Sequence, residues 1–539
     1  MVGSAASEAN LPRNETINHM KRIFTISMML AVFGLNAQER YLDEVFDEVS
    51  VTEDVIYATN VTVITALQGM PPAALPQFMD VYEPVGDTLT NRPLVLLFHT
   101  GNFLPQYLNG SALGTRKDSS IVELCNRFAR MGYVTASVDY RLGWNPLAGT
   151  QVERTYQLIN AAYRGVQDAR TAVRYFRMDA AEMGNTYGID PDKIAMFGDG
   201  TGGYVTLASA TLQDYNDIIL NNAGEAITSF WYDPGDGSFI PMVIEAINGD
   251  PEAKQDGFAP DGTQLCIGHY PDYSSDFNFQ MNTGGALGSA EWLDSGDVPM
   301  VSFHCPHDQF APYTTGVVVV PTTNEPVIEA TGAYDFHTLI NSQAAPNNND
   351  VFQSLNLSDD ISLAANALND GMDGLYPVLN NYVDGAPTEP FDSSPWQWWD
   401  VAVTQAVDSA NGSNIAANGL MMNPTMGADE ALPWIDIIQG YTAPRMAAAL
   451  GLTEPVNQVD EAEQNAGFQI YPNPTNGVTT IVFEQAASHC SLYSLDGRMV
   501  RQWPLIGVEK NFTVDLSNLS AGTYVIQIGS NSELISISK

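Results

Sequence analysis

The spacing of apolar and polar residues changes character along the chain. Residues 49–55, 61–67 and 77–82 alternate between the two types, which predicts short, half-buried strands. From residue 93 onward, continuously apolar runs alternate with stretches of helical period. Further strands are expected at 94–98, 134–138, 193–197 and 300–303, and helices at 121–131, 156–179 and 431–450.

Continuous apolar runs separated by helices are typical of parallel strands that are buried on both faces. Residues 38–451 are therefore expected to form an α/β domain with a mostly parallel sheet flanked by helices. The Gly- and Asp-rich interval before residue 300 is expected to be a mixture of loop and cap.

The texture changes again near the C-terminus. Residues 452–467 are polar and without apolar periodicity, which indicates a linker. Beyond it, short alternating strands separated by turn residues predict a small β-sandwich over 468–539. Its strands are expected at 479–483, 491–494, 511–515 and 523–528.

The N-terminal segment has the layout of a signal peptide. Met20, Lys21 and Arg22 precede an apolar stretch at 23–35 and a small residue at Ala37. Residues 1–37 are therefore expected to be an N-terminal extension and signal peptide that is removed on export. The apolar stretch is too short to cross a bilayer, and no later segment has the roughly 20 apolar residues of a membrane helix.

Composition narrows the function classes. The 539 residues are 45% hydrophobic, enough for a sizeable core, and carry 22 Lys and Arg against 63 Asp and Glu, a formal charge of −41. Such a surface repels nucleic acid and anionic lipid, so neither is expected as a partner. The four cysteines do not have the spacing of metal ligands, and no metal or cofactor is expected. Whether they form disulfides, and in which pairs, does not follow from the sequence.

Three motifs follow one another in the C-terminal region: YPNPTNG at 471–477, LYSLDGR at 492–498 and LSAGTY at 519–524. Together they resemble the type A sorting domain of the type IX (Por) secretion system, an immunoglobulin-like β-sandwich. The resemblance implies that residues 468–539 engage the secretion machinery. The protein would then be released or attached to the outer-membrane surface of a Gram-negative cell. The alternative is an ordinary adhesive module of the same fold.

The larger domain contains a strand and turn, VLLFHTGNF at 95–103, that resembles the oxyanion loop of esterases and lipases, with Thr100 in place of the first glycine. In that family, backbone amides after this strand stabilise the charge that develops on the attacked carbonyl. The resemblance places oxyanion-hole amides at Thr100, Gly101 and Thr201. It gives His99 a structural role.

The turn GDGTGG at 198–203 follows an expected strand and resembles the nucleophile elbow Gly-x-Ser-x-Gly of the esterase-like α/β-hydrolases. Gly200 occupies the place of the nucleophilic serine, so the usual acyl-enzyme cannot form. Thr201 is an alternative nucleophile. It lies one residue after the nucleophile position, however, so its side chain would no longer be aligned with the oxyanion loop. A phosphate-binding interpretation of the glycines lacks the acidic residue of the dinucleotide pattern.

The remaining triad members are sought downstream. The segment 297–313 resembles the strand and loop that carry the triad acid, and Asp308 takes that position. Before the linker only His337 follows it as a candidate base, with a structural histidine as the alternative. Trp396, Trp398 and Trp399 are either a stacking surface for a ligand or a packed core.

These residues favour a secreted or cell-surface α/β-hydrolase-fold protein that is catalytically inactive and acts by binding. An ester, a lipid or a glycan is the candidate ligand. One alternative is an active carboxylic-ester hydrolase that uses Thr201, or another non-standard nucleophile, with Asp308 and His337. A second is that Gly200 is a lone change in an otherwise intact esterase site.

Overall fold

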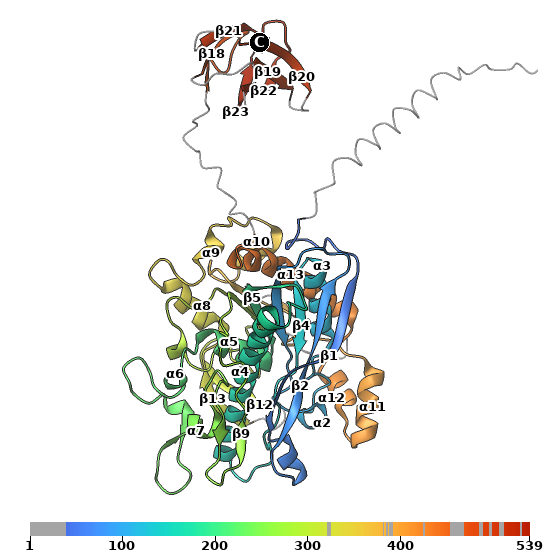
Figure 1. Cartoon of the computed structure of the whole chain (residues 1–539), viewed down its shortest axis with the longest axis vertical. Coiled ribbons are helices and arrows are strands. Elements are labelled where there is room, and N and C mark those ends of the chain that lie inside the picture. The colour runs from blue at the N-terminus through green and yellow to red at the C-terminus, as the bar shows by residue number, and fades with distance from the viewer. Residues whose placement is uncertain are drawn as a thin grey trace, which may run out of the picture. The chain divides into compact units, whose positions relative to one another are not determined.

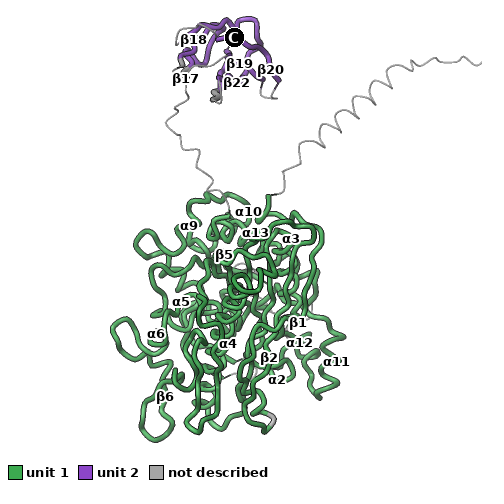
Figure 2. The backbone as a smooth tube through the Cα atoms, viewed as in Figure 1, with its two compact units in different colours: residues 1–453 green, residues 454–539 purple. Residues whose placement is uncertain are grey.

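The computed structural model describes residues 39–320, 325–380, 382–383, 386–387, 392–423, 426–452, 468–483, 489–494, 498–505, 511–528 and 531–538. The chain divides into two compact units, residues 1–453 and 454–539, and each is described by itself (Figure 2). The expected signal peptide and nearly all of the expected linker lie outside the described residues.

An eight-stranded sheet forms the centre of the first unit. Its strands are β1 (Val49–Thr62), β2 (Ala73–Pro84), β3 (Arg92–Phe98), β4 (Val134–Val138), β5 (Ile189–Asp199), β10 (Phe279–Thr283), β11 (Met300–His304) and β14 (Leu375–Pro377). They are ordered β1-β2-β4-β3-β5-β10-β11-β14. The first two strands run antiparallel to their neighbours, and the six from β4 to β14 pair in parallel. The expected mostly parallel sheet is confirmed.

Helices cover both faces of this sheet (Figure 1). The helices α4 (Gln151–Glu182) and α5 (Thr201–Thr211) contribute to one apolar core, and α3 (Ser119–Arg130) and α13 (Ala428–Ala449) to the other. Every residue of β3 and β4 is buried, because these central strands are covered on both sides.

Shorter elements surround this framework. The helices are η1 (Ile64–Gln68), α2 (Gln106–Asn109), α6 (Tyr215–Ile219), η2 (Thr228–Phe230), α7 (Glu245–Asn248), η3 (Ala290–Trp292), α8 (Ala333–Ser342), α9 (Asp350–Gln353), α10 (Asp360–Asn366), α11 (Val401–Asn411) and α12 (Ile415–Met422). The strands are β6 (Trp231–Tyr232), β7 (Ile240–Pro241), β8 (Gly257–Phe258), β9 (Gln264–Cys266), β12 (Gly316–Val320), β13 (Glu325–Ala330), β15 (Tyr382–Val383) and β16 (Ala386–Pro387).

Two expectations about local structure were wrong. The strand expected at 61–67 is the end of β1 followed by the 3-10 helix η1; the Thr62 hydroxyl accepts a hydrogen bond from the Ile64 amide at 3.2 Å and starts that turn. The interval before residue 300 contains β10, a core strand. Its Gln280 and Asn282 are buried but bond to Thr206 and Ser302, and polar positions of this kind hide a strand from an apolar pattern.

A buried ion pair joins α4 to the sheet. Arg141, just after β4, lies 2.9 Å from the Asp168 carboxylate of α4, and the side chains are 2% and 0% exposed. The same carboxylate accepts from the Arg141 amide and from the Gln77 side chain of β2, both at 2.7 Å. Such a pair is costly to break because the remaining charge stays buried.

The second unit consists of two antiparallel sheets. One is ordered β17 (Phe468–Tyr471), β18 (Val478–Phe483), β21 (Asn511–Asp515), and the other β20 (Met499–Pro504), β19 (His489–Ser494), β22 (Gly522–Ile528), β23 (Asn531–Ile537). Ile481, Leu492 and Ile526 are fully buried between them. The expected immunoglobulin-like β-sandwich is confirmed, although part of the second motif, 495–497, lies outside the described residues.

Three further observations concern the described residues alone. None of their helices is both long and apolar enough to cross a membrane. Their His, Cys, Asp and Glu side chains form no group able to hold a metal ion. Cys125, Cys266, Cys305 and Cys490 are each buried and unpaired.

We expect Asp168→Ala to lower the free energy of unfolding by about 3 to 5 kcal/mol, because it leaves the Arg141 guanidinium charged and buried. Urea denaturation followed by tryptophan fluorescence measures this loss. The matched control is Asp436→Ala, which removes an exposed partner of Arg127 and is expected to cost less than about 1 kcal/mol. Equal losses of unfolding free energy in the two variants would show that the buried pair stabilises the fold no more than an exposed one.

Candidate functional site

A strained turn lies at the centre of the site. β5 ends at Asp199 and α5 begins at Thr201, so Gly200 alone joins strand to helix. Its φ of 51° and ψ of −113° fall in a region that residues with a side chain rarely adopt. A Cβ on Gly202 would lie 2.2 Å from the Phe98 carbonyl oxygen, so helix and sheet approach more closely than a side chain would allow. The turn has the form of a nucleophile elbow.

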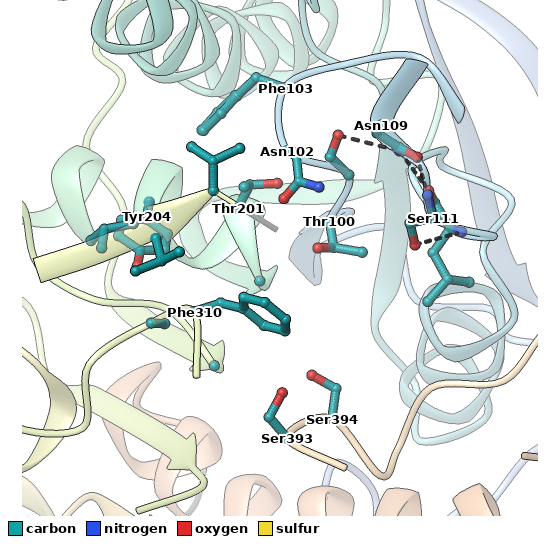
Figure 3. Close-up of a pocket in the computed structure, with 18 of the residues that line it drawn as sticks. Thr100, Asn102, Phe103, Asn109, Ser111, Thr201, Tyr204, Phe310, Ser393 and Ser394 are labelled. Atoms are coloured by element: carbon teal, nitrogen blue, oxygen red, sulfur yellow. Dashed lines mark hydrogen bonds between the residues drawn. The ribbon is translucent and has the colours of Figure 1, made fainter. Parts of the chain in front are cut away.

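Thr100 occupies the space beside this elbow. A Cβ added to Gly200 would lie 2.3 Å from the Thr100 hydroxyl oxygen and 3.0 Å from its Cβ, which is closer than atoms can approach without a shift. Figure 3 shows Thr100, Thr201 and Phe310 around the open centre of the pocket. A hydroxyl from the loop after β3 therefore stands close to the position that a side chain on residue 200 would require.

The loop after β3 presents backbone amides to the same space. Asn102 and Phe103 have φ values of 54° and 55°, and the Trp144 indole donates to the Asn102 carbonyl at 2.8 Å and fixes the turn. Within the described residues, the amides of Gly101 and Asn102 donate to no acceptor, and the amide of Thr201 begins a helix, where no intrahelical acceptor exists. These donors could hold a carbonyl oxygen of a ligand.

His99 is buried beneath that loop. Its ring bonds to the Thr100 carbonyl, lies 3.4 Å from the Asp139 carboxylate and stacks on Tyr140 at 4.6 Å. Burial acts to lower the pKa of His99, but the bond and charge of Asp139 outweigh it and raise the pKa. The Tyr140 hydroxyl donates to the His99 carbonyl at 2.9 Å and lies 3.1 Å from the Thr201 hydroxyl. His99 thus supports the loop from below.

The segment after β14 reaches back to the elbow. The Trp396 indole and the Gln397 amide donate to the Asp199 carboxylate at 2.9 and 2.7 Å, and the Thr283 hydroxyl donates at 2.7 Å. Trp396 is 1% exposed, as a packed core residue is, whereas Trp399 lines the pocket. Burial raises the pKa of Asp199.

Asp308 lies in the loop after β11 and lines the pocket. Its Oδ1 accepts from the amides of Phe310 and Ala311 at 2.8 and 3.0 Å. Burial, with the charge of Asp392 added, raises the pKa of Asp308 to about 7. Both donors are backbone amides, and none of the ion pairs between described residues includes Asp308.

His337 lies elsewhere. It belongs to α8, and its Nε2 lies 2.9 Å from the hydroxyl of Ser302, in the middle of β11. It is fully buried, and burial lowers its pKa to about 3. The structure therefore brings Thr100, Gly101, Gly200, Thr201 and Asp308 to one pocket, and it does not bring His337 there.

The pocket is a cavity of about 660 Å³ above the elbow. No histidine, lysine or arginine is among the described residues that line it. Several lining residues escaped the sequence analysis, and no local motif marks them: Tyr204, Phe310, Asp392, Ser393, Ser394 and Asn423. For Asp392, Ser393 and Ser394, the one available indication was that they follow the last strand of the sheet, where loops commonly carry site residues.

Comparisons with known proteins follow this geometry. The BD-FAE family model matches residues 79–229. Among solved structures, the propionate-bound form of the esterase Est2 from Thermogutta terrifontis is 14% identical, with a TM-score of 0.29, over 70% of this chain and 95% of its own. The tabun-phosphoramylated form of esterase 2 from the same organism is 18% identical, with a TM-score of 0.27, over 49% of this chain and 74% of its own.

A second family model, described as a secretion system C-terminal sorting domain, matches residues 469–539. No curated protein matches the chain. The two family matches and the observed sheets agree on both units. The chain combines an esterase-like α/β-hydrolase domain with a C-terminal sorting domain of a secretion system.

Proposed function

We propose that this is an exported protein whose α/β-hydrolase domain no longer hydrolyses esters and instead binds a ligand at the former active site. The observation that carries the proposal is Gly200, which has the backbone conformation of a nucleophile and no side chain. An open cavity above it leaves room for a ligand.

Two further features support the loss of hydrolysis. Thr100 fills the space that a serine at residue 200 would need, so the change at Gly200 is not an isolated one. No histidine is among the described residues that line the cavity with Asp308, and a triad aspartate acts only by orienting such a base. Nucleophile and base are therefore both missing from the described site.

The alternative is ester hydrolysis through Thr201, with Asp308 and His337. The Thr201 hydroxyl lies 3.1 Å from the hydroxyl of Tyr140, whose pKa burial raises far above neutrality, so Tyr140 cannot serve as a base. His337 bonds to Ser302 in the core. Neither arrangement favours proton removal from Thr201.

The sorting domain supports export. We infer that a signal peptide within residues 1–37 directs the chain across the inner membrane and that residues 468–539 engage the type IX machinery at the outer membrane. The product is then secreted or held at the cell surface.

Hydrolysis of p-nitrophenyl acetate and butyrate by the full chain tests the loss of catalysis. We expect no turnover above buffer for the unchanged protein, for Gly200→Ser, or for Thr100→Gly/Gly200→Ser, because a serine without a histidine remains protonated. Turnover by the unchanged protein that disappears in Thr201→Val would establish the alternative. Turnover by Gly200→Ser alone would show that Gly200 is a lone change in an intact site.

A double-mutant cycle tests the packing of Thr100 against Gly200. We expect Gly200→Ala to lower the free energy of unfolding by about 2 to 4 kcal/mol, from overpacking and from the positive φ. In a Thr100→Gly background the loss should shrink by at least about 1 kcal/mol, because only the backbone strain remains. Urea denaturation measures both losses, and equal losses would contradict the contact.

Removal of residues 468–539 tests the export route. In a host with a type IX system, we expect the truncated protein to remain in the periplasm, whereas the full chain reaches the medium or cell surface. Cell fractionation and immunoblotting measure the distribution. Replacing Asp436, an exposed residue of the hydrolase unit, by Ala should leave it unchanged. Normal delivery of the truncated chain would reject the proposed role of the sorting domain.

A further inference from the structure

The residues that line the cavity are of two chemical kinds, apolar and polar. Much of its surface is apolar and comes from residues on several elements: Phe103, Leu113, Trp144, Ile159, Val327 and Ile328. Its acidic lining residues are Asp308 and Asp392, and Ser393, Ser394 and Gln397 line it as well. Its volume of about 660 Å³ suits an organic molecule of moderate size.

Neither acidic group forms an ion pair with a basic side chain of the described residues. Asp308 uses Oδ1 for two backbone amides, and Oδ2 has no hydrogen-bond donor among the described residues. Asp392 accepts from the Asn423 amide group and the Ser394 backbone, both neutral, at 2.8 and 2.9 Å. Buried carboxylates of this kind usually require a positive partner.

Two aromatic lining residues have polar atoms without a hydrogen-bond partner among the described residues. The Tyr204 hydroxyl and the Trp399 indole N–H are buried and form no hydrogen bond in the described structure, and the charge of Asp308 acts on Tyr204. Both residues line the cavity. Aromatic faces next to carboxylates are the surroundings that bind organic ammonium groups.

Anionic, neutral and cationic ligands therefore fit this cavity unequally well. An anion would meet two carboxyl groups and no described basic residue, in a protein of net charge −41. A neutral apolar ligand would displace water from both carboxyls and would not replace the hydrogen bonds that water made to them, which disfavours its binding. An ammonium group supplies charge and N–H donors together.

We propose that the cavity binds a cationic amine carried on an apolar body, with the ammonium group beside Asp308 and Asp392 and the body against the apolar wall. This ligand class rests on the proposed binding function.

Calorimetric titration of the full chain with hexylamine, 1-hexanol and hexanoate, which share one carbon chain, tests the ligand class. We expect hexylamine to bind at least about tenfold more tightly than 1-hexanol, and hexanoate not to bind. Asp308→Asn and Asp392→Asn should each weaken hexylamine about tenfold or more and leave 1-hexanol unchanged, which also shows that the variants are folded.

Asp297→Asn is the matched control. Asp297 is a buried carboxyl with a pKa raised to about 7, bonded to Gln213 and the Asp294 amide, and it does not line the cavity. It should leave hexylamine binding unchanged. Equal binding of the three probes, a preference for hexanoate, or no binding of hexylamine would overturn the amine assignment. The ester assay tests the loss of catalysis separately. If hexylamine failed to bind and no ester were hydrolysed, the amine assignment would fall while the loss of catalysis would stand.

Hexylamine affinity should also rise between about pH 5 and pH 8, because Asp308 and Asp392, with pKa values of about 7 and 6, lose their protons over this range. The other titratable groups near them are His307, which precedes Asp308 in the chain, and Cys305, Tyr204 and Glu430. Burial raises the pKa of Cys305 and of Tyr204, so both stay neutral. A flat pH profile would contradict the role of the two carboxylates.

Discussion

The close approach of two backbones at the elbow is the constraint on which the site depends. A Cβ on Gly198 would lie 2.1 Å from the Gly202 carbonyl oxygen, and one on Gly202 would lie 2.2 Å from that of Phe98. Any side chain here would push α5 away from the centre of the sheet. Close packing alone therefore requires glycines in this turn, and the turn has the geometry of a nucleophile elbow although residue 200 is a glycine.

Two segments from other parts of the chain pack against this turn. The loop after β3 places Thr100 against Gly200, and the segment after β14 carries no histidine among its described residues. That segment instead anchors Trp396 and Gln397 on Asp199, a residue of the elbow itself. Residues of both segments line the cavity, and the described ones include no histidine that could act as a base.

Two kinds of buried carboxyl coexist in this domain. Asp168 is matched by Arg141 and by neutral donors, and it ties a helix to the sheet. Asp308 and Asp392 have neutral donors alone within the described structure, and burial raises the pKa of each. The first arrangement is complete within the fold. The second is completed by a cation from outside, and this difference separates an architectural carboxylate from one that faces a ligand.

The sequence by itself determined the parallel sheet, the elbow and the C-terminal β-sandwich, because continuous apolar runs, clustered glycines and turn residues are local signals. It could not show β10, whose buried Gln280 and Asn282 donate hydrogen bonds to partners distant in the chain. Only the tertiary structure decided that His337 bonds to Ser302 and that the Thr100 side chain stands against residue 200. Such relations depend on how separate elements pack, and the spacing of residues within one element does not encode them.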